Sequence, residues 1–101
     1  MAVTSKVLFR GAASTTSGTT LYTTPASAVA VVTNIGITNT TTGSVTATIS
    51  LDDVALISGV SVAANTSIFI DLKQVVDASD TIKGSASTTA VNFHISGVEI
   101  A

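Results

Sequence analysis

The stretch that decides the fold runs from Val32 to Asp53 and reads VTNIGITNTTTGSVTATISLDD. In its second half, SVTATISL, apolar residues alternate strictly with Thr and Ser. This alternation is typical of an antiparallel strand with one face on a core and the other toward solvent. The Thr-rich segment before it, ending in Gly43, has the composition of a loop between two strands. The stretch therefore predicts two antiparallel strands joined by a polar loop.

The same period of two recurs along most of the chain. In TSIFIDL, Ile68, Ile70 and Leu72 alternate with Ser, Phe and Asp, and VNFHISGVE repeats the pattern around Phe93. Turn-forming residues such as Asp52-Asp53 and Ala64-Asn65 separate the runs. We predict an all-β fold, an antiparallel β-sandwich of about eight short strands, of which the jelly roll is one form. The expected strands are Lys6–Arg10, Thr19–Thr23, Val29–Asn39, Ser44–Leu51, Val54–Val62, Thr66–Leu72, Thr81–Ser85 and Val91–Glu99.

The first 20 residues differ from the rest. GAASTTSGTT, residues 11–20, is polar and of low complexity. We therefore expect residues 1–20 to be an N-terminal arm or a first strand followed by a polar linker, and residues 21–101 to be the β-sandwich domain. The apolar run Val7–Phe9 either pairs with the sheet edge of a neighbouring subunit or forms an ordinary first strand of the same domain.

Charge is scarce in this sequence. Charged residues make up 10% of the 101 residues, and the formal net charge is −2, whereas ordinary domains have about 25% charged residues. No segment is basic enough to neutralise phosphates, which argues against a nucleic-acid partner. ASAVAVVTNIGI, the longest weakly polar run, is too short to span a bilayer, and no signal peptide is visible at the start. Burying Thr, Ser and Ala costs less free energy than burying unpaired charges. We therefore expect this surface to be covered by other chains in a homo-oligomer.

Residues for chemistry are few. His94 is the single histidine and there is no cysteine, so a zinc site lacks ligands. Ile95-Ser96-Gly97 lacks the leading Gly of a nucleophile elbow. The acidic pair Asp52-Asp53 and the segment 77–80 have the pattern of turns rather than of a calcium loop. The sequence therefore predicts a protein that is not an enzyme and has no cofactor and no metal site.

One ordered set of short motifs goes beyond a generic β-protein. It comprises a Tyr-Thr-x-Pro-Ala start at Tyr22, the strand end Asn39, the Ala64-Asn65 turn, Asp71-Leu72, and the segment 78–82, where Ser79 replaces a frequent Gly. With these motifs, residues 21–99 resemble a family of small structural proteins of tailed bacteriophages.

The resemblance implies a non-enzymatic virion component. Within that class it favours a capsid decoration, or cement, protein that binds the major capsid protein and stabilises the lattice, with a trimer as the favoured oligomer. Such a protein would be made in the cytoplasm of the bacterial host and would reside on the capsid surface. The alternative is a part of the tail, baseplate or fibre, with host-surface binding as one role.

Two segments are candidates for contact with the capsid or with neighbouring subunits. The first is the segment from Met1 to Arg10, which we expect to act as a gripping arm. The second is the Thr-rich loop that precedes Gly43. The candidate contact residues are Val3, Lys6, Val7, Leu8, Phe9, Arg10, Thr40, Thr41 and Thr42.

Overall fold

The computed structural model describes residues 2–101, so Met1 of the expected arm lies outside the described residues. Within that range the chain is all β and contains no helix, hence none long enough to cross a membrane. The strands are β1 (Val3–Ala12), β2 (Thr20–Thr23), β3 (Val29–Asn39), β4 (Val45–Leu51), β5 (Val54–Val62), β6 (Ser67–Val76), β7 (Thr81–Ala86) and β8 (Val91–Ile100). The predicted eight-stranded fold class is confirmed.

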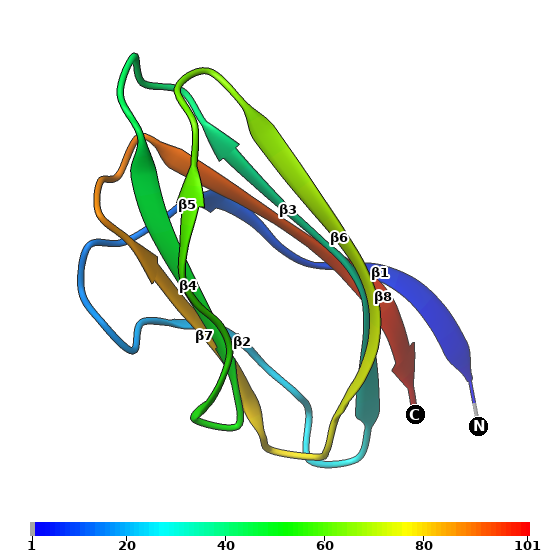
Figure 1. Cartoon of the computed structure of the whole chain (residues 1–101). Helices are drawn as coiled ribbons and strands as arrows, with labels where there is room; N and C mark the ends of the chain where they lie inside the picture. Colours follow the sequence, from blue (N-terminus) through cyan, green and yellow to red (C-terminus); the bar gives the residue numbers. More distant parts are fainter. Residues whose placement is uncertain (1) are drawn as a thin grey trace.

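The strands form two four-stranded antiparallel sheets that face each other (Figure 1). Sheet A has the order β1-β8-β3-β6, and sheet B has the order β2-β7-β4-β5. The chain crosses between the sheets at most of its turns, and only β4 and β5 are consecutive strands of one sheet. The backbones of Ala2 and Ala101 hydrogen-bond to each other, so the two ends of the described chain lie side by side.

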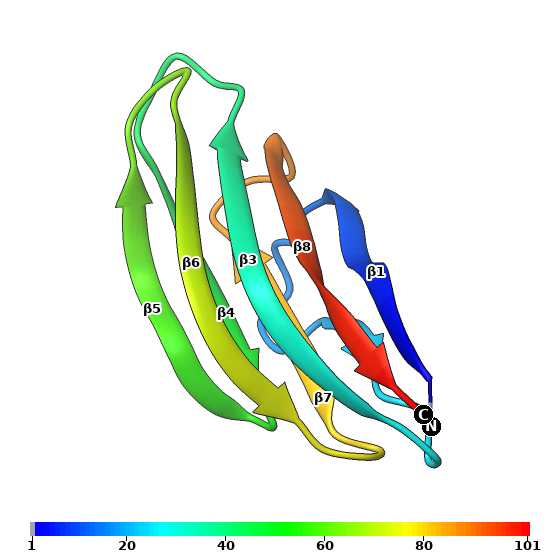
Figure 2. The same ribbon diagram turned by 90° about the vertical axis from the view of Figure 1, so that its right-hand side faces the viewer.

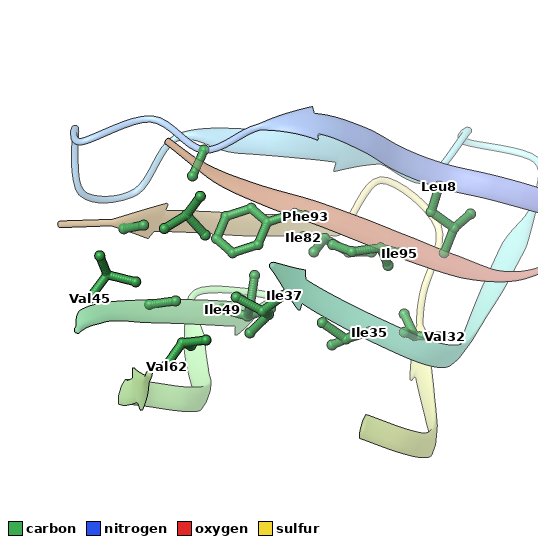
Figure 3. Close-up of a cluster of buried hydrophobic side chains, with 14 of the residues drawn as sticks. Leu8, Val32, Ile35, Ile37, Val45, Ile49, Val62, Ile82, Phe93 and Ile95 are labelled. Carbon is green, nitrogen blue, oxygen red and sulfur yellow. The ribbon is translucent and has the colours of Figure 1, made fainter. Parts of the chain in front are cut away.

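The core fills the space between the sheets. Residues of the predicted alternation point inward: Ile49 on β4 and Phe93 and Ile95 on β8 are fully buried. Ile35 and Ile37 on β3 are fully buried as well. Figure 3 shows these side chains together with Leu8 of β1 and Ile82 of β7 in one cluster. Because both sheets contribute, burial of this cluster is the main contribution to holding them together.

Two strands are longer than their sequence pattern predicted. The first strand begins at Val3 rather than Lys6, because residues 3–6 pair in register with the end of β8, Gly97–Ile100. The sixth strand continues past Leu72 to Val76, because its second half pairs with the start of β3 at Ala30–Val32. Both strands lie at the edges of sheet A (Figure 2).

Tight turns occur where the sequence indicated them. Asp52 and Asp53 have φ of 51° and 61°, which is the backbone of a type I′ hairpin turn and matches the right-handed twist of β4 and β5. Ser79, in the turn between β6 and β7, has φ of 66°. This left-handed conformation favours Gly, although Ser occupies it here.

Candidate interaction surfaces

Residues 2–101 contain no arrangement that resembles an active site. His94 lies on the outer face of sheet A, half-buried, in one cross-strand row with Arg10 and Gly36. No three His, Cys, Asp or Glu side chains within this range are placed to hold a metal ion.

The N-terminal candidate segment is an edge strand of the chain's own sheet. β1 pairs with β8 over its whole length, and its register shifts between Val7 and Phe9. The shift places neighbouring side chains on the same face, so that Leu8 is buried in the core and Phe9 packs against the core. Leu8 and Phe9 therefore hold β1 in the sandwich, with Leu8 buried and Phe9 half-buried.

Among the other candidate residues of β1, Val3, Val7 and Arg10 point away from the core, whereas Lys6 lies on the inner face. Val3 is 67% exposed and Val7 is 46% exposed. Lys6 forms a 3.1 Å ion pair with Glu99. Arg10 is exposed, and within residues 2–101 it has no carboxylate within ion-pair distance. Val3, Val7 and Arg10 are thus the outward-facing members of the β1 set, and the side chain of Lys6, which is 44% exposed, is also accessible to a partner.

The loop with Thr40, Thr41 and Thr42 is fixed by a buried amide. Asn39, at the end of β3, donates from Nδ2 to the carbonyls of Gly43, Val62 and Ala63, and its Oδ1 accepts from the backbone and hydroxyl of Thr41. Thr40 donates its hydroxyl to the carbonyl of Ala90. Thr40 and Thr42 are exposed, whereas Thr41 is half-buried. The loop is therefore a shaped protrusion, and Asn39 also links β3 of sheet A to the end of β5 in sheet B.

The exposed apolar residues share one location. Six large apolar side chains are exposed within residues 2–101, and every one lies on an edge strand: β1, β5 or β6. Two of them, Val3 and Val7, belong to the predicted set. The other four were not predicted: Val54, Leu56, Phe69 and Val75.

We call the long side of the sandwich formed by the edge strands β5 and β6 the β5–β6 side. β5 is hydrogen-bonded only to β4 and β6 only to β3, so no ladder joins the two sheets here. Ile68 and Leu72, whose alternation points them inward, remain partly exposed because no strand covers them. On the outer face, Phe69 is 69% exposed and its ring lies over Gly36, where an added Cβ would come 2.9 Å from the ring.

Acidic residues gather at the end of this side that is formed by the β4–β5 and β6–β7 turns. Asp52, Asp77 and Asp80 come from the β4–β5 and β6–β7 turns and line a shallow hollow of about 290 Å³ together with Val54 and other residues. Burial and the nearby carboxylates of Asp52 and Asp77 raise the pKa of Asp80. Asp53 does not line this hollow. Its carboxylate forms a 2.6 Å ion pair with Lys83. The β5–β6 side is therefore apolar with a negative end.

The opposite long side, which we call the β1–β2 side, is closed. Tyr22 of β2 donates its hydroxyl to Glu99 of β8, and Lys6 of β1 pairs with the same carboxylate oxygen, so three side chains connect the two sheets. Burial and the hydrogen bond to Glu99 raise the pKa of Tyr22 to about 12. The hydrogen bonds from Tyr22 and Lys6 lower the pKa of Glu99. Partly buried Phe9 and Leu21 pack against the core on this side.

Comparison with known proteins does not assign the chain to a family. No family model and no curated protein matches it. Among solved structures, it is similar to a pentameric capsid protein isolated from metagenomic phage sequences, with 16% identity and a TM-score of 0.26. That alignment covers 97% of this chain, which spans 60% of the length of the other.

Proposed function

We propose that this chain is a non-enzymatic structural protein of a bacteriophage virion, and within that class a capsid decoration protein that binds the major capsid protein. The observation that carries the proposal is the placement of the exposed apolar side chains on edge strands, in a chain with only 10% charged residues. Exposed apolar patches and unprotected sheet edges are typical of surfaces that other chains cover.

The strand order also supports this proposal. Eight strands in two four-stranded sheets, with most turns crossing between the sheets, correspond to a double-sheet jelly roll, an architecture that occurs in viral capsid domains. Lectins and cupins share this architecture, so the fold alone does not decide the function. The family resemblance of residues 21–99 adds support for a virion role.

The mechanism we propose is multivalent clamping. One oligomer, for which we favour a trimer, would bind several capsid subunits at once, so that individually weak contacts add up to high avidity. Binding only to the expanded lattice would stabilise that lattice by mass action. The contact residues we propose are the exposed members of the candidate set, together with Val54 and Leu56 of β5.

The test is the copy number in purified virions of the phage that encodes the chain, measured by quantitative mass spectrometry. A decoration protein is expected at hundreds of copies per particle. A few to a few dozen copies would instead place the chain in the tail, baseplate or fibre, and absence from the particle would overturn the virion role.

A binding assay identifies the surface. The purified chain is added to expanded capsids that lack it, and occupancy is read after sedimentation. We expect the double variant Val54→Asp and Leu56→Asp to remain folded and to lose occupancy. A matched change on the exposed linker, Ser17→Asp, is expected to leave occupancy unchanged. Full occupancy of the double variant would exclude β5 from the capsid contact.

A further inference from the structure

We propose that copies of this chain associate head to tail through sheet A, with the β1 edge of one copy added to the β6 edge of the next. The proposal deepens the homo-oligomer contained in the proposed function and rests on it in that respect. It requires no capsid partner, so the two proposals can fail separately.

The two edges have compatible strand directions. Sheet A is antiparallel throughout in the order β1-β8-β3-β6, so β1 and β6 run in opposite directions. A second copy placed beside the first in the same orientation would set its β1 antiparallel to β6. Each strand has 10 residues and one hydrogen-bonded neighbour within its own chain. Such an edge is a template for pairing with another chain.

Charge favours pairing of unlike edges over like edges. On β1, Lys6 is neutralised by Glu99, and Arg10 remains as the free cation. β6 carries one carboxylate, Asp71, and one ammonium, Lys73, and no ion pair joins the two. Pairing β1 with β1 would bring two copies of Arg10 to the same edge, whereas pairing β1 with β6 in the register of the sheet places Arg10 near the carboxylate of Asp71.

The register within the sheet defines which residues of the two edges would face each other. Arg10 pairs with His94, His94 with Gly36, and Gly36 with Phe69, so one row crosses the outer face from edge to edge. In an unstaggered join, Arg10 of one copy would lie beside Phe69 of the next and diagonal to Asp71 on the same face. A guanidinium on an aromatic ring beside a carboxylate is a favourable arrangement.

Apolar side chains match in a second row. Ser5, Val98, Val31 and Val75 form a row across the outer face. In the same unstaggered join, Val3 of one copy would lie diagonal to Val75 of the next. These two side chains are 67% and 60% exposed in the single chain. Four of the six exposed apolar side chains, Val3, Val7, Phe69 and Val75, belong to the two edges. Because the two surfaces differ, the assembly would be a closed ring or an open array.

The test is the solution mass of the full chain, measured by light scattering after size exclusion over a range of concentrations. The wild type is expected as a multiple of 10.0 kDa. Arg10→Glu and Asp71→Arg should each shift the association midpoint at least about tenfold toward higher concentration. The double variant that carries both changes should recover the wild-type mass, because every interface then has the reversed pair.

The controls separate this inference from simpler explanations. Lys83→Glu makes the same change in net charge on the outer face of sheet B and is expected to leave the mass unchanged. Recovery in the double variant cannot arise from misfolded chains. A monomeric wild type, an Arg10→Glu variant with unchanged mass, or a failed recovery would each overturn head-to-tail pairing. A monomer that still occupies capsids would overturn this inference and leave the proposed function standing.

Discussion

The two long sides of the sandwich are built differently. On the β1–β2 side, Leu8 and Phe9 reach the core from one edge strand, and the Tyr22–Glu99–Lys6 network connects the sheets. On the β5–β6 side, apolar side chains remain exposed, and Asn39 at one end is the side-chain link from sheet A to β5. The β1–β2 side is therefore closed within the chain. The β5–β6 side has the exposed apolar residues that are typical of a surface covered by another chain.

Removing one leucine from each side should give the largest difference. Leu8→Ala on the closed side is expected to cost about 2–5 kcal/mol of unfolding free energy, because it leaves a cavity in the core. Leu56→Ala on the open side, where Leu56 is 38% exposed, should cost at most about 1 kcal/mol. Urea unfolding at one fixed protein concentration measures both. Equal losses would mean that the two sides contribute equally to the stability of the single chain.

The amide at the end of the open side should have the next largest effect. Asn39→Ala removes a buried donor from three carbonyls and is expected to cost about 1–3 kcal/mol. Thr42→Ala, on the exposed part of the same loop, should stay within about 0.5 kcal/mol. Thermal unfolding followed by circular dichroism compares the two. If Asn39→Ala behaves like Thr42→Ala, the amide does not fix the loop.

The polar network should make the closed side sensitive to pH. The raised pKa of Tyr22 means that its contribution to stability is present below pH 10.0 and is lost as the pH rises toward about 12. The lowered pKa of Glu99 means that its contribution is present above pH 4.5 and is lost as the pH falls through the lowered value. Tyr22→Phe should remove the alkaline loss and weaken the acid one. The melting temperatures of the wild type and Tyr22→Phe are compared across pH. If the two chains show the same pH dependence, the network does not have this role.

The smallest effect on stability is expected at Phe69. Because the ring is 69% exposed on the outer face, Phe69→Ser should change the unfolding free energy of the single chain by no more than about 0.5 kcal/mol. The same variant should weaken self-association, which analytical ultracentrifugation measures. A large loss of stability without a change in association would mean that the ring serves the fold rather than a partner.

Much of the fold could be predicted because alternation reports burial directly. The bounds of β3 and β5 were predicted to the residue, and Ile68, Ile70 and Leu72 were correctly separated from Phe69. The extra lengths of β1 and β6 could not be predicted, since they depend on pairing with β8 and β3, which lie far away in sequence. The order of strands in the two sheets was beyond the sequence pattern for the same reason.

The exposure of the candidate contact residues could be predicted only in part. Val3, Val7 and Arg10 are accessible, but Leu8 is buried because a register shift turns it inward. Val54 and Leu56 were missed, because VALISGV has the pattern of a buried strand and only the strand order shows that β5 is an edge. Phe69 gave a usable signal, since it is a large apolar residue at an outward position of a regular alternation.

Hydrogen exchange provides the most direct test of the claim that the open side is covered by another copy. Exchange is compared, peptide by peptide, between the wild type and Arg10→Glu at one protein concentration. We expect amides of β6 to exchange faster in the variant, because β6 has lost the β1 strand of the neighbouring copy. This effect would appear on the edge of sheet A opposite to Arg10. A change confined to β1, or no change at all, would contradict the pairing of β1 with β6 of the next copy.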